Sequence, residues 1–121
     1  MTRLQVAQAA YHGAAEALDA AHAAARPELL ACIAANKGRE DDGWIAELVA
    51  IEDRHGLPQA TDAQRAAKTE LIAAAREQTT RDPEFLRQSL ERQQLTIEAF
   101  AAARMYPQTE RRLLDLCMRM A

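Results

Sequence analysis

The sequence predicts an all-α protein: a compact bundle of five to six helices, packed antiparallel in an up-and-down order and joined by short loops. Its 121 residues are enough for one domain, so the range 1–121 is expected to form a single helical domain. Alanine accounts for 28 residues, whereas Val, Ile and Thr together number 14, too few for a β-sandwich or barrel. Glycine and proline number only four each, which argues against a loop-rich chain.

Capping and breaking residues set the expected ends of the helices. Thr2 and Gln5 form a capping box, in which each side chain satisfies a free backbone N–H, and Thr61 and Gln64 repeat it. Pro27 is expected to end one helix and to open the next, because its ring disfavours helical geometry in the residue before it. The expected helices are 2–25, 27–37, 41–55, 61–80, 83–105 and 108–120.

Small and large apolar residues are expected to lie on different helices. Alanine dominates the apolar stripes of 2–25 and 61–80, and such stripes allow another helix to approach closely. Asp41 or Asp42 is expected to cap the helix 41–55. The segment 83–105 carries one continuous seam at heptad spacing, formed by Leu86, Leu90, Gln93, Ile97 and Phe100. We therefore expect large side chains of some helices to fit against the alanine faces of others, or a close-packed dimer seam.

The bulk charge and hydropathy exclude several function classes. The net charge of -3 and the pI of about 5.6 give no reason to expect nucleic-acid binding. No apolar run of about 18 residues predicts a membrane span, and polar residues such as Gln8 and Glu16 interrupt any signal peptide. Because no export signal is expected, Cys32 and Cys117 are predicted to be reduced thiols in the cytoplasm. With 13 Arg against 2 Lys, the composition is typical of a GC-rich bacterial or phage gene.

Two regions are candidates for binding a protein partner. Residues 38–62 hold seven acidic and two basic residues, and this acidic segment includes an aromatic side chain that is typical of interface hot spots. The terminal helix offers a row of soft apolar side chains that suit adaptable partner surfaces. The candidate residues are Glu40, Asp41, Asp42 and Trp44 in the first region, and Leu113, Cys117 and Met120 in the second.

An alternative interpretation is a ferritin-like metal-binding four-helix bundle. Such bundles hold two metal ions with Glu-x-x-His motifs that project inward from the helices. This chain has two acid-x-x-His pairs, Asp19 with His22 and Glu52 with His55. His55 is also explained as a cation in the last turn of a helix, next to the negative end of the helix dipole.

Motifs for catalysis are absent from the sequence. The single serine, Ser89, is expected inside a helix, and four glycines cannot build a phosphate loop. Glu110, Arg111 and Arg112 are the only cluster suited to an anionic substrate. Five glutamates spaced seven apart are expected to form a solvated face, namely Glu70, Glu77, Glu84, Glu91 and Glu98. The sequence therefore favours a helical protein–protein interaction module without catalytic activity or cofactor, which binds a protein partner or itself, as in a homodimer.

Overall fold

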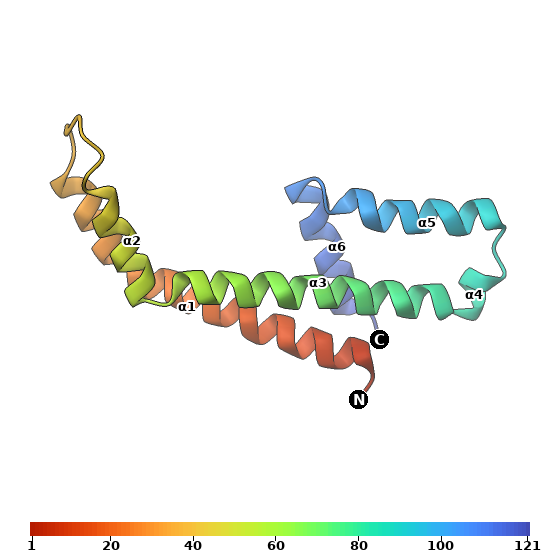
Figure 1. Ribbon diagram of the computed structural model, residues 1–121. Coiled ribbons are helices and arrows are strands. Elements are labelled where there is room, and N and C mark those ends of the chain that lie inside the picture. The colour runs from red at the N-terminus through yellow and green to blue at the C-terminus, as the bar shows by residue number, and fades with distance from the viewer. The chain divides into compact units, whose positions relative to one another are not determined.

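The computed structural model describes residues 1–121 and consists of six helices without a strand (Figure 1). The helices are α1 (Arg3–Ala35), α2 (Ile45–Arg54), α3 (Leu57–Arg81), α4 (Pro83–Leu86), α5 (Leu90–Ala103) and α6 (Pro107–Arg119). The predicted all-α class is thereby confirmed. No helix combines the length and the apolar character that crossing a membrane requires.

The chain divides into two compact units, and the two longest helices run through both. Unit 1 consists of residues 1–11 and 66–121, and unit 2 consists of residues 12–65. The first turns of α1 and the larger part of α3 therefore belong to unit 1, whereas the rest of both helices belongs to unit 2.

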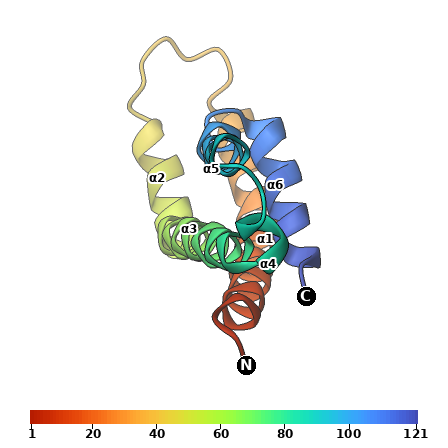
Figure 2. The same cartoon turned by 90° about the vertical axis from the view of Figure 1, so that its right-hand side faces the viewer.

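Unit 1 contains the main hydrophobic core. In this unit α3 is followed by the short α4, and α5 then returns in the opposite direction beside α3 (Figures 1 and 2). Alanine supplies the small members of this core. The core residues are Leu4 and Ala7 of α1, Leu71, Ile72, Ala74 and Ala75 of α3, and Leu114 and Cys117 of α6.

Polar contacts at the start of α1 fix its first turns within unit 1. The Thr2–Gln5 capping box is confirmed: the Gln5 amide donates to Thr2 Oγ1 at 3.1 Å, and the Thr2 amide donates to Gln5 Oε1 at 2.9 Å. The Gln8 side-chain amide donates to the carbonyl oxygens of Cys117 at 2.8 Å and Met120 at 2.9 Å, at the end of α6. These carbonyls have no partner inside their own helix, so Gln8 acts as a cap supplied by another helix.

Unit 2 is a helical hairpin with a small core. The C-terminal part of α1 is followed by a loop and by α2, and Gly56 then leads into α3 with a φ of 67°. Gly38, after α1, has a φ of 87°. Both glycines adopt the left-handed conformation expected at helix ends. The buried side chains of this unit are Ala25, Cys32, Asn36 and Leu57.

The predicted break at Pro27 is wrong, because α1 continues from Arg3 to Ala35 with Pro27 inside it. A proline removes one backbone hydrogen bond and crowds the preceding turn, which weakens a helix without always ending it. Here Ala23, Ala24 and Ala25 precede the proline and strong helix formers follow it. Ala25 is fully buried, so the packing of this region also holds the helix together across the proline.

Two helix starts differ from the prediction. The helix expected at 41–55 begins at Ile45, and its N-cap residue Trp44 makes no side-chain cap hydrogen bond. Asp41 instead stabilises the preceding turn, since its carboxylate accepts from the amide of Gly43 at 3.2 Å. The helix expected at 61–80 begins four residues earlier, at Leu57, because the turn at Gly56 leads directly into it.

The segment 83–105 forms two helices in place of one. Asp82 caps α4, with its carboxylate accepting from the Glu84 backbone amide at 2.8 Å. Ser89, expected inside a helix, is the N-cap of α5, and its hydroxyl accepts from the Arg92 amide at 3.3 Å. A side chain that caps a helix competes with continued helix at the same position, which explains the break. The predicted seam is therefore interrupted, and its first two members, Leu86 and Leu90, are exposed.

Candidate protein-binding groove

An open apolar groove of about 570 Å³ lies on unit 1 between α5 and α6. Apolar side chains and the methyl groups of alanine and threonine form most of its surface, and Arg112 is its one charged lining residue. The α5 side is lined by Thr96, Ala99, Phe100 and Ala103, and the α6 side by Thr109, Arg112, Leu113, Leu116, Cys117 and Met120.

The spacing of residues on α6 determines which side chains face the core and which face the groove. Leu114 and Cys117 are three residues apart and buried in the core of unit 1. Leu113 and Leu116, also three apart, lie further round the helix on the side of α5 and line the groove. Leu116 is 61% exposed, so most of its apolar surface is left uncovered by unit 1.

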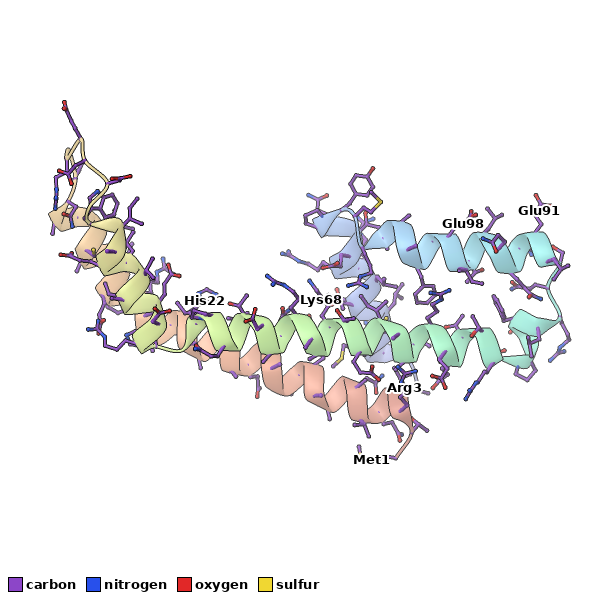
Figure 3. The ribbon with its side chains drawn as sticks, in the orientation of Figure 1. Met1, Arg3, His22, Lys68, Glu91 and Glu98 are labelled. Atoms are coloured by element: carbon purple, nitrogen blue, oxygen red, sulfur yellow. The ribbon has the colours of Figure 1, made fainter.

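A partly buried ion pair holds the start of α6 against α3. Pro107 occupies the first turn of α6, where a missing backbone N–H costs nothing. One turn later, Glu110 Oε1 accepts from Lys68 Nζ of α3 at 2.7 Å, and both side chains are largely buried. Figure 3 shows Lys68 on α3 within unit 1. This contact anchors the helix that forms one side of the groove.

The exposed charged residues on this side of α6 are Arg112, Asp115 and Arg119, which together carry a net charge of +1. Arg112 lines the groove, and Arg119 follows it by seven residues, hence on the same side of α6. Both guanidinium groups are exposed, and neither forms an ion pair. The arrangement can therefore hold an apolar helix face and, beside it, a carboxylate that pairs with an arginine.

The structure places the three predicted residues of the terminal helix at this groove, at different depths. Cys117 is 1% exposed, and burial raises the pKa of its thiol, so it is mainly a core residue. Leu113 and Met120 are half-buried, pack against the core and line the groove. Both cysteines are free and buried.

The predicted acidic residues lie in unit 2, in the loop before α2. Glu40, Asp41 and Asp42 are exposed, and Trp44 is half-buried. Part of their charge is compensated locally, because Arg39 Nη2 lies 2.7 Å from Asp41 Oδ1. The acidic segment and the terminal helix are thus parts of different units.

The structure gathers no group of three or more His, Cys, Asp or Glu side chains that could hold a metal ion. Asp19, His22 and Glu52 are exposed, and Figure 3 shows His22 on α1. His55 lies beside Glu28 of α1 instead, with its Nε2 3.3 Å from Glu28 Oε2. The acid-x-x-His pairs therefore do not form a metal centre here.

His55 and Glu28 make a structural contact within unit 2. The two atoms are close enough to form an ion pair when His55 is protonated. Their geometry does not meet the criteria of a hydrogen bond, so the buried Nε2 of His55 has no hydrogen-bond partner. Arg54 also pairs with Glu28. His55, and to a smaller extent Arg54, hold the pKa of the Glu28 carboxyl below its usual value, because they favour its charged form.

Several charged residues that were expected on the surface form ion pairs between helices of unit 1. Glu110 pairs with Lys68, so the cluster of Glu110, Arg111 and Arg112 does not act as a unit. Glu70 and Glu77, expected on a solvated face, both pair with Arg3 at the start of α1 (labelled in Figure 3). Glu91 and Glu98 remain exposed on α5, as expected.

Several residues of the groove are not recognisable as such from the sequence alone. Leu116 lies outside the apolar row of Leu113, Cys117 and Met120, and Arg112 stands in a charged cluster with Glu110 and Arg111. The repeated small residues Ala99 and Ala103, four apart on α5, were the available signal, since they leave room beside a facing helix. Only the position of α6 relative to α5 turns these residues into a groove.

Fold and site together define an all-α protein that carries an open apolar groove with one arginine, Arg112, among its lining residues. No family model, curated protein or solved structure matches the chain.

Proposed function

We propose that this protein is a helical protein–protein interaction module without catalytic activity, and that the groove between α5 and α6 binds an amphipathic helix of a protein partner. The observation that carries the proposal is the exposed Leu116 in an open apolar groove of about 570 Å³. Burying a leucine side chain fully contributes about 1.5–3 kcal/mol, so leaving it in water favours association.

The open form of the groove favours a helix over a small molecule. Sites for small ligands enclose most of the ligand surface, whereas this groove is a shallow channel between two helices. An amphipathic helix needs only a groove that accepts apolar side chains at positions i, i+3 or i+4. Leu113, Leu116 and Met120 repeat at spacings of three and four residues, which match such a partner.

The charges beside the groove indicate the chemistry of the partner. Arg112 and Arg119 are exposed and without ion pairs, so an acidic side chain flanking the apolar face of the partner would pair with them. A basic helix would meet like charges and would bind less tightly. The partner we propose is an acidic amphipathic helix.

The cellular setting belongs to the same proposal. Cys32 and Cys117 are both free thiols, which is the usual state in a reducing compartment. We therefore place the module in the cytoplasm, with a protein or a second copy of the chain as its partner.

A pair of synthetic helices tests the proposal. One fluorescently labelled peptide carries leucines at i, i+3, i+4 and i+7 with glutamates on either side, and the other replaces every glutamate by lysine. We expect the acidic peptide to bind at least tenfold more tightly, as measured by fluorescence anisotropy in about 0.1 M salt. Equal or absent binding of the two peptides contradicts the proposal.

A matched pair of variants locates the binding site. Leu116 and Leu95 are exposed to similar extents, 61% and 57%, and both lie in unit 1, but only Leu116 lines the groove. We expect Leu116→Glu to weaken binding of the acidic peptide at least tenfold and Leu95→Glu to leave it within twofold. Circular dichroism checks that both variants keep the helical content of the parent. A larger loss from Leu95→Glu would place the binding site elsewhere.

A further inference from the structure

Helix α2 of unit 2 has an unpartnered apolar surface that resembles the ligand proposed for the groove. None of its ten residues is buried. Ile45 and Val49, four residues apart, are 46% and 51% exposed. Glu52 and Asp53 follow on the same side of the helix, so the apolar pair is flanked by carboxylates. The helix is thus acidic and amphipathic.

The two units carry opposite net charges. Unit 2 has ten acidic and five basic residues, a net charge of -5, whereas unit 1 has eight acidic and ten basic residues, a net charge of +2. Opposite charges favour an encounter between unit 2 of one molecule and unit 1 of another, whereas two copies of unit 2 repel each other.

We propose that the groove between α5 and α6 binds α2 of a second copy of this chain. The inference rests on the proposed function, because it takes the groove as a helix-binding site and names its occupant. Ile45 and Val49 enter the apolar part of the groove against Leu116, while Glu52 and Asp53 face Arg112 and Arg119. A ten-residue helix is about 15 Å long, which is three turns and enough for two apolar anchors.

This contact joins two different surfaces of the chain. Two copies that each insert α2 into the groove of the other form a closed, isologous dimer, whereas one-way insertion is heterologous and lets further copies add at the free ends. In both cases the association depends on protein concentration and weakens with salt, because carboxylates and arginines take part.

Sedimentation velocity across a range of protein concentrations tests self-association. We expect the weight-average sedimentation coefficient of the parent protein to rise with concentration at 0.05 M salt and to rise at least threefold less steeply at 0.5 M salt. Val49→Glu and Leu116→Glu are each expected to leave a monomer. The control Ala50→Glu adds the same charge to α2 about 100° further round the helix, and is expected to retain association.

Mixing the two deficient variants is the decisive experiment. The Val49→Glu protein keeps an intact groove, and the Leu116→Glu protein keeps an intact α2, so an equimolar mixture is expected to form a one-to-one dimer that neither variant forms alone. Persistent self-association of Val49→Glu would indicate contact between two grooves, and that of Leu116→Glu would indicate contact between two α2 helices. Either result, or a mixture that stays monomeric, overturns the inference.

The failure of this inference can be told apart from failure of the proposed function. A synthetic peptide of residues 43–56 is expected to bind the parent protein and to dissociate its dimers, and its Val49→Glu form is expected to do neither. If the parent is monomeric and this peptide does not bind, while the leucine–glutamate peptide still does, the inference is wrong and the helix-binding function stands. If neither peptide binds, both are wrong.

Discussion

Lys68 Nζ of α3 and Glu110 Oε1 of α6 lie 2.7 Å apart, with side chains only 22% and 18% exposed. The pair links α3 to α6 through two residues that are 42 positions apart in sequence. It explains why α6 is held at the position where Leu113 and Leu116 face α5. The ion pair therefore contributes both to the stability of unit 1 and to the shape of the groove.

Removal of one partner of this pair is expected to destabilise the protein. Lys68→Met leaves the Glu110 carboxylate partly buried without its cation, which should lower the free energy of unfolding by about 1–3 kcal/mol. Urea unfolding followed by circular dichroism measures the change. The double variant Lys68→Met, Glu110→Leu should recover part of the loss. A double variant as unstable as the sum of the two single variants would show that the residues are not coupled.

The Gln8 side chain is expected to stabilise the end of α6. Gln8→Ala leaves the carbonyl oxygens of Cys117 and Met120 without their donor, and should lower the free energy of unfolding by about 1–2 kcal/mol. Gln94→Ala is the matched control, since its side chain bonds only to the exposed Glu98. Equal unfolding midpoints of the two variants in urea would rule out the capping role of Gln8.

Pro27 is expected to weaken α1 although it does not end it. Pro27→Ala restores a backbone donor inside the helix, worth about 3 kcal/mol, but makes the unfolded chain more flexible by up to about 1 kcal/mol. We therefore expect Pro27→Ala to raise the free energy of unfolding, measured by urea unfolding, by about 2 kcal/mol. Pro58→Ala is the control, because the second residue of a helix has no intrahelical acceptor for its N–H. We expect Pro58→Ala to bring no increase in the free energy of unfolding.

The paired glutamates are expected to make stability depend on acidity. Arg3 lowers the pKa of the Glu70 carboxyl, and His55 with Arg54 lowers that of Glu28. A lowered pKa in the folded state means that the unfolded state takes up protons first as the pH falls. Both contributions are therefore fully present above the unfolded pKa of about 4.3 and are lost as the pH falls through the lower folded values.

Substitutions separate these contributions from general acid unfolding. Thermal unfolding midpoints measured between pH 6 and pH 3 should fall less steeply for Glu28→Gln and Glu70→Gln than for the parent. Glu91→Gln is the control, because the exposed Glu91 carboxylate makes no ion pair. Identical pH profiles for all three variants would show that the ion pairs do not contribute to acid sensitivity.

Local signals in the sequence determined the helical class and most of the helix ends. The capping box of Thr2 and Gln5 depends on contacts within a few residues, which is why the sequence reveals it. The errors at Pro27 and Ser89 arose where two local tendencies compete. Proline disfavours a helix that its alanine-rich surroundings favour, and a serine can either continue a helix or cap the next one.

The tertiary structure alone decided which apolar residues are covered. Leu114 and Leu116 are two residues apart and equally apolar, yet only the first is buried. The partners of Arg3 and Lys68 lie 67 and 42 residues away, and no local pattern identifies contacts at such separations. Burial and pairing depend on which helices meet, so the sequence determined the helices, and their packing determined the groove.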